Sequence, residues 1–95
     1  MINLTTKTPD VIQAELAERV RARRKELHYS QAELAHRSGV SLGSLKRFEH
    51  THEISLVSLV KLSFALGCSD DFDKLFARQH YRSIEEVIAD AEQHS

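Results

Sequence analysis

The sequence predicts an all-α protein, and three observations carry this prediction. One proline and three glycines in 95 residues leave few positions for loops. Apolar residues recur at helical spacing in several segments of the chain. Helix start signals, in which a serine or threonine comes directly before an apolar-periodic run, also recur. We expect five helices in one domain, followed by an amphipathic helix at the C-terminus.

The length and composition suit one domain with short extensions. We expect an N-terminal arm at 1–8, the helical domain at 9–78 and a C-terminal extension at 79–95. A single cysteine excludes an internal disulfide and is compatible with a reducing cytoplasm. No N-terminal segment resembles a signal peptide. The most apolar stretch, 54–67, has 14 residues and contains a lysine, so it is too short and polar to span a membrane.

The first helix is predicted to begin at Pro9, with Thr8 as its cap, and to run to about Leu27. Residues 1–7 before it are compatible with either a short strand or a disordered arm. The apolar positions of the helix follow helical spacing, and they are Ile12, Leu16, Val20 and Leu27.

The segment 30–49 is predicted to form two short helices joined by a tight turn. Ser30 and Glu33 have the spacing of a capping box, so the first helix begins there. Gly39 suits a left-handed residue that ends this helix. Ser41 then caps a second helix that ends at about Glu49. The apolar positions that we expect to pack inward are Leu34, Val40, Leu45 and Phe48.

Two further helices are predicted to complete the domain. Ser55 caps a helix from Leu56 to Leu66, and apolar residues lie around most of its circumference, so we expect it to be buried at the centre. Gly67 closes this helix, and Ser69 caps a fifth one. The fifth helix presents an apolar face that either packs inward or forms a dimer contact, consisting of Phe72, Leu75 and Phe76.

A last helix is predicted from Ser83, which forms a second capping box with Glu86, to about Gln93. Its apolar stripe consists of Ile84, Val87, Ile88 and Ala91. Such a stripe requires burial against the domain, against a second copy of the chain or against another protein, and the sequence leaves these three alternatives open.

Charge is distributed unevenly along the chain, although the net charge is only −1. The segment 19–47 has eight basic and two acidic side chains, a net charge of +6, whereas 69–95 has a net charge of −4. A basic patch on one face is what a protein needs to contact DNA phosphates. The acidic C-terminal part either avoids DNA or is simply a solvated helix surface.

The segment 30–49 resembles the helix-turn-helix of the Cro/phage-repressor superfamily, also called the Xre family, and a looser resemblance covers 16–76. The residues that carry it are Gln31, Ala35, Gly39, Val40, Leu45, Phe48 and Glu49. The resemblance implies a five-helix repressor-like DNA-binding domain whose recognition helix, Ser41 to Glu49, enters the major groove. It also implies a homodimer that represses transcription from a palindromic operator on double-stranded DNA in the bacterial nucleoid.

The resemblance assigns base reading to three positions, occupied here by Leu42, Gly43 and Arg47. The guanidinium of Arg47 suits guanine O6 and N7. Leu42 either meets a thymine methyl or contributes nothing specific, and Gly43 has no side chain to read with. The resemblance places Gln31 on a phosphate or a base edge, and the candidates for phosphate contacts are Ser30, Ser41, Ser44, Lys46, Thr51 and His52. For Ser30 and Ser41 the alternative is that helix capping uses their hydroxyls fully.

The resemblance also implies an ion pair between Arg24 and Glu49 that ties the first helix to the recognition helix. The alternative is two separate surface charges.

We expect no cofactor and no metal site, because His50 and His52 alone do not make a metal-binding pattern. We expect no enzyme activity either, because no phosphate-binding glycine loop or nucleophile–base pair is present.

Finally, the chain resembles the antitoxins of toxin–antitoxin operons in size and layout, which implies a cognate toxin partner held by the C-terminal helix. A stand-alone regulator of phage or host genes is the alternative.

Overall fold

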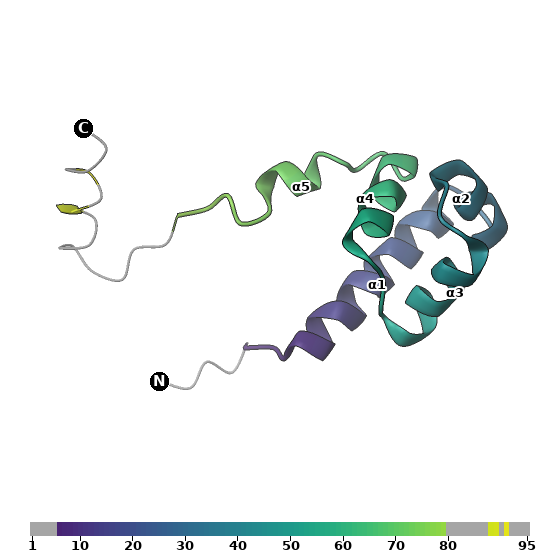
Figure 1. Ribbon diagram of the computed structural model, residues 1–95, viewed down its shortest axis with the longest axis horizontal. Helices are drawn as coiled ribbons and strands as arrows, with labels where there is room; N and C mark the ends of the chain where they lie inside the picture. The colour runs from purple at the N-terminus through teal and green to yellow at the C-terminus, as the bar shows by residue number, and fades with distance from the viewer. Residues whose placement is uncertain (1–5, 80–87, 90, 92–95) are drawn as a thin grey trace.

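A computed structural model describes residues 6–79, 88, 89 and 91 of the chain. Its elements are α1 (Pro9–Glu26), α2 (Gln31–Ser38), α3 (Leu42–Thr51), α4 (Leu56–Ala65) and α5 (Asp71–Lys74). Helices are the only regular elements within these residues, so the all-α prediction is confirmed. Figure 1 shows α2, α3 and α4 gathered against α1, whereas α5 stands away from them.

Helices α1 to α4 begin where the start signals predicted. The Thr8 hydroxyl accepts from the Val11 amide at the start of α1. At the start of α2, the Ser30 hydroxyl accepts from the Glu33 amide at 3.0 Å, and the Glu33 carboxylate accepts from the Ser30 amide at 3.2 Å. This is the reciprocal capping box that satisfies two amides without a helical partner. Ser41 and Ser55 cap α3 and α4 by a single bond each, because their hydroxyls accept from the amides of Ser44 and Ser58 at 3.1 and 3.2 Å.

The ends of α2 and α3 both use a left-handed residue. Gly39 has φ +76°, and its amide donates to the Ala35 carbonyl at 3.0 Å, which turns the chain sharply toward α3. α3 ends at His52, which has φ +69° although it is not a glycine. α3 therefore continues to Thr51, two residues beyond the predicted end at Glu49.

The core lies between α1, α2, α3 and α4, and Ala17 is the buried apolar residue that α1 contributes. Its largest fully buried side chains are Leu34, Leu45, Phe48, Leu62 and Leu66. Leu45 and Phe48 lie one turn apart on the inner face of α3, so burying them turns the opposite face of the same helix outward. The core therefore decides which residues of α3 meet the solvent.

The prediction that α4 is buried on most sides is wrong. Leu62 and Leu66 point into the core, but Leu56, Val57 and Phe64 are 68%, 62% and 69% exposed. The described part of the chain leaves one side of α4 uncovered, because the residues that follow turn away from it (Figure 1). An apolar composition around a helix does not by itself show that neighbouring helices cover it.

The prediction for the fifth helix is only partly right. α5 exists, but it is a single turn of four residues, its N-cap is Asp70 rather than Ser69, and its cap has no side-chain hydrogen bond. The expected inner face is largely exposed, at 54% for Leu75 and 95% for Phe76. Leu75 is already extended and Phe76 has φ +60°, so the chain leaves the helical conformation before a second turn forms.

The predicted C-terminal helix at 83–93 lies outside the described residues, apart from Ile88, Ala89 and Ala91. Ile88 is 51% exposed. Residues 1–5 of the predicted arm also lie outside the described part. Both predictions therefore stay predictions.

Two leucines of α3 provide a matched test of this packing. Leu45 is fully buried, whereas Leu42, three residues earlier, is 37% exposed. Leu45→Ala should reduce the free energy of unfolding by about 2–5 kcal/mol, and Leu42→Ala should change it by less than about 0.5 kcal/mol. Urea unfolding followed by circular dichroism measures both, and equal losses would contradict the inward placement of Leu45.

Candidate nucleic-acid interface

The outer face of α3 presents a continuous row of exposed residues. Ser41 caps the helix, and the exposed positions that follow are Leu42, Gly43, Ser44, Lys46 and Arg47. The buried positions Leu45 and Phe48 alternate with them at helical spacing. The residues that the sequence assigned to DNA contact on this helix thus share one solvent-facing surface.

A buried ion pair between Arg24 and Glu49 fixes the other side of α3. The Arg24 Nε donates to one carboxylate oxygen of Glu49 at 3.0 Å, and Nη2 donates to the other at 2.9 Å. The two side chains are only 10% and 7% exposed. Arg24 Nη1 also donates to the Tyr29 carbonyl at 2.9 Å. This bidentate geometry gives α1, α3 and the start of α2 a defined relative position.

Gln31 joins the same network. Its Nε2 donates to a carboxylate oxygen of Glu49 at 3.2 Å, and the Arg21 guanidinium lies 4.0 Å from that oxygen. The predicted DNA contact of Gln31 therefore starts from a side chain that Glu49 already positions. An amide nitrogen carries two N–H donors, so this bond leaves a second one for a phosphate or base edge.

The hydroxyl groups of the predicted phosphate contacts have roles within the protein. Ser41 Oγ accepts from the Ser44 amide at 3.1 Å and donates to Ser44 Oγ at 2.8 Å. Thr51 Oγ1 donates to the Arg47 carbonyl at 2.8 Å and so belongs to α3 rather than to the loop. Of these residues, His52 alone stands at the turn, as the left-handed C-cap. The Ser41 hydroxyl thus caps α3, and the predicted phosphate contact of Ser41 stays a prediction.

On the exposed face of α3, the structure shows an ion pair that the sequence did not predict. Arg47 Nη2 donates to Glu53 at 2.9 Å, and the two side chains are 68% and 63% exposed. They are six positions apart in the chain, which is not a spacing at which helical side chains meet. The contact arises because α3 ends at His52 and the chain turns back, and nothing in the sequence pattern predicted that left-handed residue.

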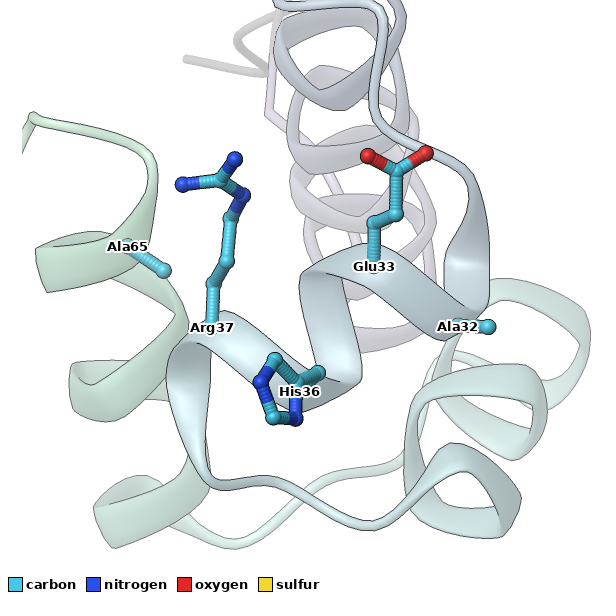
Figure 2. A pocket seen from close by; sticks show the side chains of 5 residues that line it. All are labelled: Ala32, Glu33, His36, Arg37 and Ala65. Atoms are coloured by element: carbon cyan, nitrogen blue, oxygen red, sulfur yellow. The ribbon is translucent and has the colours of Figure 1, made fainter.

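An open hollow lies on the outer surface of α2 beside α4. It is lined by Ala32, Glu33, His36, Arg37 and Ala65. Figure 2 shows Glu33 and Arg37 extending to one side of α2, with Ala65 facing Arg37 from α4. Glu33 caps α2, and the Arg37 guanidinium lies 4.5 Å from the centre of the Tyr29 ring. Both charged groups thus have structural roles, and we assign no site to this hollow.

The environment of Cys68 favours the neutral thiol. Burial raises its pKa above the ordinary value, and the nearby negative charge of Asp71 acts in the same direction against the opposing effect of Arg23. A raised pKa lowers the thiolate fraction at neutral pH.

Within the described residues, no group of three or more histidine, cysteine or acidic side chains is placed to hold a metal ion. The helices described are also too short or too polar to cross a membrane.

Comparison with known families identifies the chain. The model of the helix-turn-helix family HTH_3 matches residues 20–72, which include all of α2, α3 and α4. The chain belongs to the HTH_3 family. It is therefore a DNA-binding transcriptional regulator of the Cro/C1 type, and this family is one of regulators rather than of enzymes. No curated protein and no solved structure is significantly similar to this HTH_3 chain.

The Arg24–Glu49 pair generates a stability prediction. Arg24→Met should reduce the free energy of unfolding by about 3–5 kcal/mol, because it leaves the Glu49 carboxylate buried without its cation. Arg21→Met, which removes a half-exposed arginine near the same carboxylate, should cost less than about 1 kcal/mol.

Thermal and urea unfolding of the two variants measure this difference. The double variant Arg24→Met/Glu49→Leu should recover part of the loss, because it no longer buries an unpaired charge. An Arg24→Met protein as stable as wild type would show that the pair contributes nothing to holding α3.

Proposed function

We propose that the chain is a sequence-specific repressor that binds an operator in its own promoter region. The observation that carries this proposal is the exposed row on α3, with Lys46 and Arg47 facing outward while Leu45 and Phe48 anchor the opposite side. A helix of this kind fits the major groove. Bound over its own promoter, such a protein blocks transcription of its operon in the bacterial nucleoid.

Base reading on this surface depends chiefly on Arg47. Its guanidinium can donate two parallel hydrogen bonds to guanine O6 and N7. Leu42 is 37% exposed and can contact a thymine methyl, and Gly43 lets the backbone approach the bases. With so few reading side chains, sequence-dependent DNA shape supplies part of the specificity. The remaining contacts, from Gln31, Ser44, Lys46, Thr51 and His52, position the protein on the phosphates.

A homodimer completes this proposal. One helix-turn-helix makes few contacts, and a two-fold dimer on a palindrome presents two recognition helices about one DNA turn, ~34 Å, apart. The uncovered apolar side of α4, with Leu56, Val57 and Phe64, supports such an association. Exposed apolar patches of this kind on small proteins are typical of interaction surfaces.

A second candidate is that the repressor is the antitoxin of a toxin–antitoxin operon. Residues 73–95 lie outside the family match, carry a net negative charge and include the predicted amphipathic stripe, whose Ile88 is half-exposed. These features suit a segment that binds a toxin. The alternative is a stand-alone regulator of phage or host genes. Co-expression with the neighbouring gene decides, because an antitoxin forms a stoichiometric complex with that product and a stand-alone regulator does not.

Arg47→Ala should weaken operator binding by about 1–3 kcal/mol and relax base preference at one position in each half-site. Lys46→Ala is the matched control, since it should weaken binding evenly across sequences and lower the salt dependence by about one unit of slope. Binding-site selection and fluorescence anisotropy measure both effects. If Arg47→Ala weakened binding to the selected site and to random DNA equally, Arg47 would contact phosphate alone.

Phe64→Glu should convert the dimer to a monomer without unfolding the domain, because the side chain is 69% exposed in the single chain. Ala32→Glu, an equally charged change on the exposed side of α2, should leave the dimer intact. Sedimentation equilibrium measures the association of each variant. A Phe64→Glu protein that dimerises as wild type does would place the interface elsewhere.

A further inference from the structure

The ion pair between Arg47 and Glu53 lies within the surface proposed to read DNA. Arg47 is on α3, and Glu53 belongs to the loop that connects α3 to α4. The two groups are 2.9 Å apart and largely exposed. Since α3 ends at the left-handed His52, the loop returns alongside the helix and carries the Glu53 carboxylate to the arginine.

Stability does not account for this contact. Ion pairs between solvent-exposed side chains contribute little to folding, because water screens both charges and two long side chains lose freedom. By contrast, the Arg24–Glu49 pair on the other side of α3 is buried and has two short hydrogen bonds. The exposed pair therefore changes the chemistry of the surface more than it changes the stability of the fold.

The pair opposes guanine recognition in two ways. Bidentate binding of guanine requires two parallel N–H groups on one edge of the guanidinium, and Glu53 already accepts one of the two N–H groups of Nη2, so it competes with guanine for one such edge. The carboxylate also neutralises the charge that attracts Arg47 to the phosphates. When DNA approaches, its phosphates repel the Glu53 carboxylate. If Arg47 turns to guanine, the attraction between Arg47 and Glu53 is lost from the complex.

We propose that Glu53 is a specificity-determining residue that competes with guanine for Arg47. This inference rests on the proposed reading of DNA by Arg47. At the correct base pair, Arg47 leaves Glu53 and binds guanine. The net gain in binding free energy is that of the guanine contact minus that of the Arg47–Glu53 ion pair. At a wrong base pair, Arg47 stays with Glu53, so the mismatch costs less than it would if the arginine had no intramolecular partner. Glu53 thus reduces both the affinity and the base discrimination that Arg47 supplies.

A double-mutant cycle on DNA binding tests the proposal. The proteins are wild type, Glu53→Gln, Arg47→Ala and the double variant, each a full chain with circular dichroism verifying its fold. The probe is a duplex that the wild type selects from a randomised library, compared with a scrambled duplex at about 50 mM salt, where charge effects are least screened. A second probe is the selected duplex with one base pair changed, namely the pair at which the Arg47→Ala protein no longer shows a base preference.

Arg47→Ala should weaken binding to the selected duplex about two- to fivefold more in the Glu53→Gln background than in wild type, because that factor is the size of an exposed ion pair. The mismatch should also cost about two- to fivefold more in Glu53→Gln than in wild type. Simple charge repulsion between Glu53 and DNA acts on all sequences alike, so it cancels from the mismatch comparison.

Glu26→Gln is the matched control, because it also removes the acid of an exposed ion pair, but its partner Arg23 faces the Leu66 carbonyl rather than α3. It should change neither comparison. The proposed role of Glu53 would be overturned if Arg47→Ala reduced DNA affinity equally in the wild-type and Glu53→Gln proteins and if the mismatch reduced the affinity of both proteins equally. A wild type that binds the selected and scrambled duplexes equally would instead overturn the proposed repressor function.

Discussion

The structure depends on the buried pair between Arg24 and Glu49. The two residues are 25 positions apart in the chain, and their side chains are almost completely shielded from water. A buried charge without its partner is strongly unfavourable, so α1 and α3 are held at the distance at which both hydrogen bonds form. The Tyr29 carbonyl and Gln31 add contacts from the start of α2, so three helices meet at one carboxylate–guanidinium pair.

This constraint complements the apolar core. Leu45 and Phe48 anchor one side of α3 and the ion pair anchors the next, so the exposed row from Leu42 to Arg47 has a fixed direction. A recognition helix that rocked on its core would bring different side chains to the groove with each encounter. Orientation fixed by two independent kinds of contact supports the proposal that a short helix with few reading residues discriminates between DNA sequences.

The sequence predicted those features that depend on local chemistry. Ser30, Gly39 and Ser41 set the two helices and the turn between them, because caps and left-handed glycines act within a few residues. The Arg24–Glu49 contact was expected from family resemblance rather than from spacing. Features that depend on the path of the chain after a helix were missed. Phe76 and His52 adopt left-handed conformations without being glycines, and these shorten α5 and bring Glu53 to Arg47.

We propose above all that the exposed face of α3 reads DNA sequence. The most direct measurement is the dissociation constant for DNA upstream of the chain's own gene, set beside that for random DNA of equal length, across a range of salt concentrations. We expect the protein to bind upstream DNA at least about a thousandfold more tightly than random DNA at physiological salt, and the affinity for both DNAs to fall as the salt concentration rises. Equal dissociation constants and equal salt slopes for the two DNAs would contradict it.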